Sequence, residues 1–424
     1  MTTSNPTQTR TGPLDGLRVV ELSSTIAGPV CARLLADFGA DVIKIESAEG
    51  DPGRNFGAQV DGVSLYGASM YRNKRAIVLD LKNPDGREVA LKLLDKADIL
   101  VENFRPGVLD RLGLGEEILR KRNPGLITAR ISGYGQSGPY RELPGYGAIC
   151  EAVAGVRHLT GDPDRPPARC ALPTTDYLTA VYAAFGTVMA LYERTRSGLG
   201  QMIDVALYES AFSQMEEAVT SYERTGIVPT RQGPRLMNTA PNSLYPTNDD
   251  HWVLIGANND PIFKRLAKVM GHPEWGADAR YATQRARGER VDEVDGLVTA
   301  WTLERSADEV QQLLIQAEVP VSRVNTIADI FEDQHYRARE MLLRIPHPSL
   351  GSVTMAGVVP KMSRTPGKIV KAGPGIGEDT RDVLAGDLGL QSAEIDRLVG
   401  EGAVWCATTG KKSVRSDPSS ATTG

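Results

Sequence analysis

The sequence predicts an α/β protein whose large domain is a doubly wound, mostly parallel sheet, accompanied by a smaller α+β domain. The first observation is that β-rich runs alternate with helical runs from residue 17 to residue 132. The second is that the middle of the chain, from about 224 to 324, is broken into short pieces by prolines. In such a sheet, ligands bind in the crevice beyond the carboxyl ends of the strands.

The first βαβ unit opens this alternation. Residues 17–22 are β-rich, a loop over 23–28 follows, and Pro29 is well placed as the first residue of a helix that Gly39 ends. Residues 41–46 are the next expected strand, and so short a unit joins parallel strands.

The pattern then recurs. We expect strands over 76–81, 97–102 and 126–132, and a helix over 84–94. The loops expected at the carboxyl edge of the sheet are 23–28, 47–54, 103–107 and 133–138.

The domain organisation follows from changes in composition along the chain. We expect a disordered arm over 1–12, a large domain over 13–223, a small domain over 224–324, a return segment over 325–406 and a disordered tail over 407–424. In the small domain, 252–256 reads as a strand and 261–270 as a helix. In the return segment, 351–361 reads as a hairpin strand that could rejoin the large domain.

Composition excludes several classes of function. A net charge of −5 gives no reason to expect a nucleic-acid or anionic-membrane partner. No apolar run approaches the roughly 20 residues needed to cross a bilayer. The four cysteines are far apart and the five histidines are scattered, so we expect no metal site and a cytoplasmic location.

One carboxylate, Asp176, is expected in the first turn of a long helix that runs to Ser197. The free N–H groups and the dipole there keep an acid ionised, so Asp176 either caps the helix or attacks an acyl group and carries it covalently. Thr174 and Thr175 are expected to supply the cap oxygens already. The helix also carries a large apolar set, which predicts a central helix with Asp176 facing a cavity: Leu178, Val181, Tyr182, Phe185, Val188 and Met189.

Other stretches have two readings each. The sequence has no dinucleotide fingerprint and no P-loop lysine motif. The basic run 71–75, with Lys82, Arg105 and Arg111, is either a solvated face or a site for a phosphorylated cofactor such as coenzyme A (CoA). The glycines of 133–139 permit close approach of a ligand or form a plain surface loop, and 256–260 is either an oxyanion or cover loop or an ordinary turn.

Several of these segments, in this order, carry a family resemblance that spans Leu14 to Leu384. The markers are Leu14–Val19, Ala27–Pro29, Phe38–Glu46, Asn73–Arg75, Val101–Gly107, Ser132–Gly135 and Thr195–Gln201. The chain resembles the class III CoA-transferases, which include formyl-CoA, crotonobetainyl-CoA and succinyl-CoA:dicarboxylate transferases. Alpha-methylacyl-CoA racemase shares their fold.

The resemblance implies an interlocked homodimer, with Asp176 as the nucleophile. It implies CoA as a substrate rather than a tightly bound cofactor, and an acyl-CoA and a small carboxylic acid as partners. The CoA contacts that it implies are Ile26, Ala27, Leu79, Asp80, Leu81, Lys82, Asn103, Phe104, Arg105, Arg111, Ser132, Gly133, Tyr134 and Gly135.

Two departures narrow the substrate. Formyl-CoA transferases have a glutamine at the position of Ile26 and a glycine-rich loop at 257–260, so a formyl/oxalyl pair is not favoured. The racemase branch has a Gly-His-Asp motif where this chain has Gly145-Tyr146-Gly147. Because a tyrosine of pKa about 10 is a poor base at neutral pH, we favour transfer over racemisation.

Three hypotheses stay open at this point: a CoA-transferase using succinyl-CoA and a dicarboxylic acid, an acyl-CoA racemase or isomerase, and a CoA-binding protein without turnover. Conceivable anchors for the acid are Arg54, Arg169 and Arg235.

Overall fold

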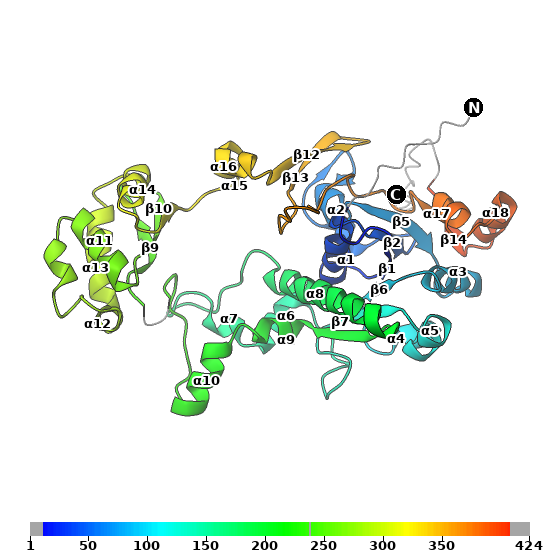
Figure 1. The fold of residues 1–424 in the computed structure, drawn as a ribbon, viewed down its shortest axis with the longest axis horizontal. Coiled ribbons are helices and arrows are strands. Elements are labelled where there is room, and N and C mark those ends of the chain that lie inside the picture. The colour runs from blue at the N-terminus through cyan, green and yellow to red at the C-terminus, as the bar shows by residue number, and fades with distance from the viewer. Residues whose placement is uncertain (1–11, 237–238, 408–424) are drawn as a thin grey trace, which may run out of the picture. The chain divides into compact units, whose positions relative to one another are not determined.

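The computed structural model describes residues 12–236 and 239–407, which form two compact units (Figure 1). One unit comprises the described parts of 1–150, 173–213 and 340–424, and the other the described parts of 151–172 and 214–339. The expected arm and tail lie outside the described residues, apart from Gly12 and Ala407. The domain boundaries at 223 and 324 stay predictions.

The first unit is built on a seven-stranded sheet in the order β14-β5-β2-β1-β6-β7-β8. Its strands are β1 (Arg18–Leu22), β2 (Asp41–Glu46), β5 (Lys74–Leu79), β6 (Ile99–Glu102), β7 (Ile127–Ser132), β8 (Met202–Ala206) and β14 (Val404–Trp405). All neighbours are parallel except β14, which pairs antiparallel with β5. The strand order reverses beside β1, between the β2 and β6 sides, as in a doubly wound sheet. The predicted α/β class with a mostly parallel sheet is confirmed.

Helices cover both faces of this sheet. The helices of this unit are α1 (Ala27–Asp37), α2 (Leu65–Met70), α3 (Pro84–Leu94), α4 (Val108–Arg111), α5 (Glu116–Arg122), α8 (Thr174–Ser197), α9 (Leu207–Phe212), α17 (Thr380–Gly386) and α18 (Ser392–Gly400), with a 3₁₀ turn η1 (Pro52–Asn55). Helix α6 (Gly147–Val153) begins in this unit, and its residues from 151 on belong to the second. Val19 packs in a cluster with α1 and α8, whereas its neighbour Val20 packs in a cluster with α3, α17 and α18. Successive side chains of a strand point to opposite faces, so the sheet has a core on each side.

Helix α8 meets the sheet through small residues, not large ones. Ala180, Ala183, Thr187 and Ala190 are buried, while the larger side chains face away from the unit. The exposed ones include Val181, Tyr182, Phe185, Val188, Met189 and Tyr192. The expectation that these large residues make α8 central is therefore wrong for a single chain, because small side chains let the helix approach the sheet closely and leave the large face uncovered.

The second unit contains a three-stranded antiparallel sheet, in the order β11-β10-β9. Its strands are β9 (Asn242–Pro246), β10 (Trp252–Gly256) and β11 (Val321–Arg323). Its helices are α7 (Val156–Leu159), α10 (Glu216–Thr225), α11 (Asp260–Val269), α12 (Gln284–Gly288), α13 (Val291–Thr302), α14 (Ala307–Gln316), α15 (Ile327–Glu332) and α16 (Gln334–Ala338), with a 3₁₀ turn η2 (Pro273–Gly276). The predicted strand at 252–256 is confirmed, and the helix predicted over 261–270 begins and ends one residue earlier.

Two small hairpins complete the sheet inventory. They are β3 (Gln59–Val60) with β4 (Val63–Ser64), and β12 (Leu342–His347) with β13 (Gly351–Ala356). The expected hairpin strand within 351–361 is therefore confirmed, and it packs on the first unit through Ile345 and Met355 beside Ala68. Among the described residues, no helix is long and apolar enough to cross a membrane.

The basic run 71–75 lies inside the first unit, so both expectations for it are wrong. Arg72 Nη2 is 2.6 Å from Asp37 Oδ2, Lys74 Nζ is 2.6 Å from Glu21 Oε2, and Arg75 Nη1 is 2.5 Å from Asp387 Oδ2. Each cation is neutralised by a carboxylate far away in the sequence, which leaves none of the three for a phosphate or for open solvent.

Candidate active site

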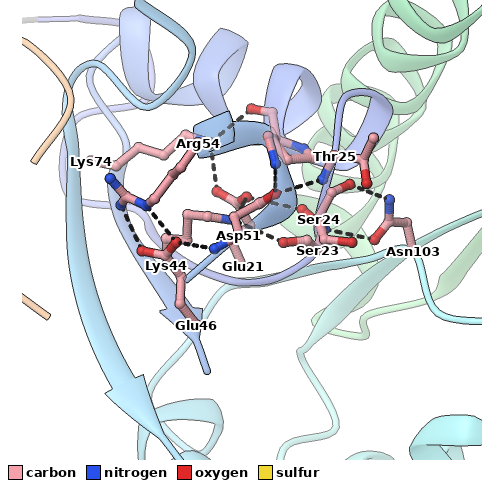
Figure 2. A network of polar contacts seen from close by, with 12 residues as sticks. Glu21, Ser23, Ser24, Thr25, Lys44, Glu46, Asp51, Arg54, Lys74 and Asn103 are labelled. Carbon is pink, nitrogen blue, oxygen red and sulfur yellow. Dashed lines mark hydrogen bonds and ion pairs between the residues drawn. The ribbon is translucent and has the colours of Figure 1, made fainter. Parts of the chain in front are cut away.

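A buried network of charges underlies the loops at the carboxyl edge (Figure 2). Glu21 accepts hydrogen bonds from Lys44 Nζ at 3.0 Å and from Lys74 Nζ at 2.6 Å, and all three side chains are fully buried. Lys44 Nζ is also 2.8 Å from Asp51 Oδ2, and Asp51 Oδ1 accepts from the N–H of Thr25 at 2.9 Å. Burial raises the pKa of Glu21, but the two ammonium groups more than offset it and hold that pKa below its usual value. The network thereby fixes the loops after β1 and β2.

Asp176 lies half-buried in the first turn of α8. The residue before the helix is Pro173, and no side chain makes the cap hydrogen bond there. The expectation that Thr174 and Thr175 supply the cap oxygens is therefore wrong, because both are already within the helix, one exposed and one buried. The carboxylate nevertheless has the expected position, at the positive end of a 24-residue helix.

The backbone packs closely against this carboxylate. A Cβ atom at Gly147 would lie 2.0 Å from Asp176 Oδ2, and a Cβ atom at Gly145 would lie 2.9 Å from the Cα of Gly133. Cys150 Sγ, in α6, donates to the carbonyl of Gly133 at 3.3 Å. Burial, with the charge of Asp176, raises the pKa of Cys150 to about 11, so the thiol stays neutral at pH 7. The segment 145–150 therefore packs against both Asp176, through Gly147, and the loop after β7, through Gly145 and Cys150.

Two side chains near the start of α8 were not predicted from the sequence. Burial raises the pKa of Tyr66, and the nearby Tyr177 and the charge of Asp176 raise it further. Arg33, on α1, lies with its Cζ 5.8 Å from the ring centroid of Tyr177, and its buried Nε has no hydrogen-bond partner. A neutral phenol therefore lies near the Asp176 carboxylate, and a guanidinium group lies beside Tyr177, the next residue of α8.

A cavity of about 600 Å³ lies at the carboxyl edge of the sheet. Five of the predicted CoA contacts line it: Leu79, Asp80, Leu81, Lys82 and Phe104. The loops after β1 and β2 supply further walls, and β14 adds Val404 and Trp405, which sequence reasoning missed. The edge of a parallel sheet at its switch point is where such a fold binds ligands.

A second cavity, of about 550 Å³, lies beside the first in the same unit. It is lined by two predicted CoA contacts, Arg105 and Arg111, and by Arg130 and Arg141. Behind it, Glu102 is buried on β6, and burial raises the pKa of Glu102 to about 7, partly opposed by the Phe104 N–H and by Arg130. Arg130 and Glu102 were also not predicted from the sequence. The available signal for Arg130 was its position two residues before Ser132, which places both on the same face of one strand.

The other predicted CoA contacts line neither cavity. Ile26 precedes α1, and Ala27 is buried in the core. Asn103 exchanges two hydrogen bonds with the backbone of Ser24, at 2.9 and 2.8 Å. In the loop after β7, Ser132 Oγ accepts from the N–H of Gly135 at 2.9 Å, the carbonyl of Gly133 accepts from Cys150, and the ring of Tyr134 lies 6.0 Å from that of Tyr208.

The three conceivable acid anchors have different surroundings. Arg54 makes two hydrogen bonds to Glu46, at 2.8 and 2.7 Å, and a third to the carbonyl of Pro374. Arg235 pairs with Asp292 and Asp295, and Arg169 is exposed. Arg54 and Arg235 are thus already neutralised.

In the second unit, the 256–260 loop is held by a fully buried arginine. Arg287 Nη2 donates to the carbonyl of Asn258 at 2.6 Å and to Asp260 at 3.0 Å. Asn259 caps α11 by accepting from the N–H of Ile262 at 2.9 Å. In the described residues, no group of histidine, cysteine or acidic side chains is arranged to hold a metal ion.

Comparison with known proteins identifies the family of this chain. The family model of CoA-transferase family III matches residues 14–380. The chain is 44% identical to succinyl-CoA–D-citramalate CoA-transferase of Chloroflexus aurantiacus, with 91% of this chain and 96% of that protein covered. It is 35% identical to succinate–glutarate CoA-transferase of Agrobacterium fabrum, with 89% and 96% covered. A CAIB/BAIF family protein from Brucella suis has a similar structure, with a TM-score of 0.79 and 34% identity, covering 88% of this chain and 99% of that one.

The chain belongs to CoA-transferase family III and is a class III CoA-transferase. It therefore acts on CoA thioesters, the substrates of CoA-transferases.

The buried charge network gives a stability prediction. Glu21→Gln leaves Lys74 without its carboxylate and Lys44 with Asp51 alone, so we expect the free energy of unfolding to fall by about 3–5 kcal/mol in urea titrations. The control Glu289→Gln removes only an exposed pair with Arg285 and should cost less than about 0.5 kcal/mol. Equal losses in the two variants would contradict this account.

The raised pKa of Glu102 predicts a pH dependence. Between about pH 4.3, where the unfolded carboxyl loses its proton, and about pH 7, where the folded one does, the folded state binds more protons. The stability of the wild type should therefore fall, relative to Glu102→Gln, by up to about 3 kcal/mol as the pH rises from 4.5 to 8. If unfolding curves across this range gave parallel profiles of stability against pH for the wild type and Glu102→Gln, they would contradict the raised pKa of Glu102.

Proposed function

We propose that this enzyme transfers CoA from succinyl-CoA to a small dicarboxylic acid through a covalent aspartyl-CoA thioester on Asp176. The observation that carries the proposal is the half-buried carboxylate at the start of α8, packed against the backbone of Gly147. The substrate class rests on relatives. Besides the D-citramalate enzyme, the beta subunit of a succinyl-CoA–L-malate CoA-transferase of Chloroflexus aurantiacus is 41% identical over 92% of this chain.

The reaction proceeds by two exchanges at one carboxylate. Asp176 attacks the thioester carbonyl of the donor, which gives a mixed anhydride and CoA thiolate. The thiolate then attacks the aspartyl carbonyl, so that succinate leaves and an aspartyl-CoA thioester remains. The acceptor carboxylate attacks this thioester, the thiolate is released again, and it takes the acceptor acyl group while Asp176 is restored. Each step exchanges one acyl bond for another, so ATP is not consumed.

The surroundings of Asp176 suit this chemistry. Water must be kept from both intermediates, and Gly147 allows the backbone to cover one side of the carboxylate. The neutral Cys150 thiol does not compete as a nucleophile. Arg33, whose guanidinium carbon lies 5.8 Å from the ring centroid of Tyr177, is our candidate for holding the second carboxylate of a dicarboxylic acid. In the loop after β7, the N–H of Gly135 already donates to Ser132 Oγ, so it is not free to donate to an oxyanion.

We place the nucleotide part of CoA along the carboxyl edge of the sheet. The support is that Leu79 to Lys82 and Phe104 line one cavity, while Arg105 and Arg111 line its neighbour. The first cavity offers apolar and aromatic walls for a base, and the second offers guanidinium groups for phosphate oxygens.

We also propose a homodimer, as the family resemblance implies. The support on this chain is the uncovered apolar face of α8, where Phe185 is 60% and Tyr192 is 68% exposed. An apolar face this large is typical of a protein–protein interface.

Trapping tests the covalent step. We expect the wild type, incubated with succinyl-CoA and hydroxylamine, to form a hydroxamate on Asp176 that peptide mass spectrometry detects. Asp176→Asn should form none and should lose transfer activity by about a thousandfold or more, while binding CoA within about threefold of the wild type.

The matched control is Asp164→Asn, which alters an exposed carboxylate of the second unit and should behave as the wild type. Unchanged turnover of Asp176→Asn would refute the nucleophile. Wash-in of deuterium at the α-carbon of an acyl-CoA, without hydroxamate, would favour a racemase instead.

The dimer has its own test. Phe185→Asp places a charge on the apolar face of α8, so light scattering should show a shift from dimer to monomer, whereas Phe185→Leu should remain dimeric. A monomeric wild type would overturn this part of the proposal.

A further inference from the structure

The second cavity contains a charged side chain that lacks hydrogen-bond partners. Arg130 is only 9% exposed, yet its Nε and Nη2 atoms have no hydrogen-bond partner, and neither has Nε2 of Gln136 beside it. Its closest carboxylates are Glu102, with Oε1 at 3.4 Å, and Glu116, with Oε2 at 3.9 Å. Buried guanidinium donors that lack partners carry a large energetic cost, unless a ligand satisfies them.

The sheet explains why Arg130 is only weakly paired. The strand register places Arg130 on β7 between Glu102 on β6 and Asp204 on β8. Glu102 instead accepts from the N–H of Phe104 at 2.8 Å, and Asp204 accepts from the N–H of Gln136 at 2.9 Å. Burial raises the pKa of Glu102 to about 7, so its compensating charge is incomplete at neutral pH. Both flanking carboxylates are used to hold loops, and the guanidinium group remains available toward the cavity.

Three other arginines line the second cavity beside Arg130. Arg105 and Arg111 are exposed, and no ion pair to either is found in the described part of the chain, whereas Arg141 has a surface pair with Glu142. Asp110 and Glu142 are the carboxylates of the lining. Several guanidinium groups around a polar hollow suit the oxygens of a phosphate group, which they can bind in pairs.

The two cavities share their dividing wall. Phe104 lines the first and Arg105 the second, and in the same way Leu112 lines the first and Arg111 the second. A single elongated ligand can therefore reach across these two segments, with an apolar part in one cavity and an anionic part in the other.

We propose that Arg130 is a phosphate-binding residue of this enzyme, and that it takes a phosphate group of CoA in the second cavity together with Arg105 and Arg111. The family resemblance implied Arg105 and Arg111 as CoA contacts, but not Arg130. The inference rests on the proposed use of CoA thioesters at the carboxyl edge. On binding, Arg130 exchanges its long contact with Glu102 for phosphate oxygens, and its unused donors become satisfied.

The test compares donors with and without phosphate groups. Succinyl-CoA carries both the diphosphate and the 3′-phosphate, succinyl-dephospho-CoA lacks the 3′-phosphate, and succinyl-pantetheine lacks all of them. For Arg130→Gln we expect KM for succinyl-CoA to rise about ten- to hundredfold, with kcat within about twofold of the wild type. KM for succinyl-pantetheine should not change.

The dephospho donor identifies which phosphate is bound. If Arg130→Gln still raises KM for succinyl-dephospho-CoA, Arg130 binds the diphosphate. If KM for that donor is unchanged, Arg130 binds the 3′-phosphate. The control Arg122→Gln removes an exposed arginine that pairs with Asp95, and it should leave all three donors unaffected. Arg130→Lys keeps the charge in case the Gln variant does not fold, and should give a smaller rise of the same selectivity.

Calorimetry with CoA and with pantetheine provides a readout apart from turnover, and the loss should be confined to CoA. An equal effect on all donors, or no effect on any, would overturn the role of Arg130 while leaving transfer itself intact. A wild type that transfers CoA from no thioester would instead overturn the proposed function.

Discussion

A single glutamate shared by two buried lysines holds the centre of the first unit together. Glu21 lies on β1, Lys44 on β2 and Lys74 on β5, so the network ties three neighbouring strands together. Charges without water are tolerated only when each is paired and hydrogen-bonded. Lys44 meets this requirement by also contacting Asp51, and Asp51 in turn fixes the backbone at Thr25. The loops that wall the first cavity thus take their shape from a charge constraint beneath them.

Close backbone packing is the second constraint, and it acts at the proposed nucleophile, Asp176. Gly133, Gly145 and Gly147 lie where any Cβ atom would meet a neighbour within 2.9 Å. The acid of a Gly-His-Asp motif at position 147 would collide with Asp176, and Tyr146, at the histidine position, is 71% exposed. The site therefore favours one acting carboxylate over the two bases that racemisation requires. The same packing covers one side of Asp176 against water.

Local signals predicted much of this architecture. The strands at 17–22 and 41–46, the helix at 84–94 and the first-turn position of Asp176 all follow from periodicity, proline and glycine positions within a few residues. The carboxyl-edge loops were predicted for the same reason, because parallel strands bring their ends to one edge. Leu79 to Lys82 and Phe104 were carried over from the resemblance, and they line a cavity at that edge.

Long-range contacts explain what the sequence did not predict. The basic run 71–75 reads as a surface or phosphate site because its partners, among them Asp37 and Asp387, are distant in the chain. The large side chains of α8 read as core because apolar periodicity does not tell which face meets the sheet. Arg33 beside Tyr177 and Arg130 beside Glu102 depend on how separate elements pack, and no spacing within one element shows that.

Oxygen exchange at Asp176 tests the central claim most directly. If the acceptor dicarboxylate is labelled with ¹⁸O in its carboxyl groups, restoring Asp176 after attack by thiolate leaves one acceptor oxygen on the aspartate. The peptide that contains Asp176 should then gain about 2 Da per labelled oxygen, only when an acyl-CoA donor is present, and other acidic peptides should not. Complete transfer of CoA to the labelled acid, with no label on that peptide, would contradict covalent carriage by this side chain.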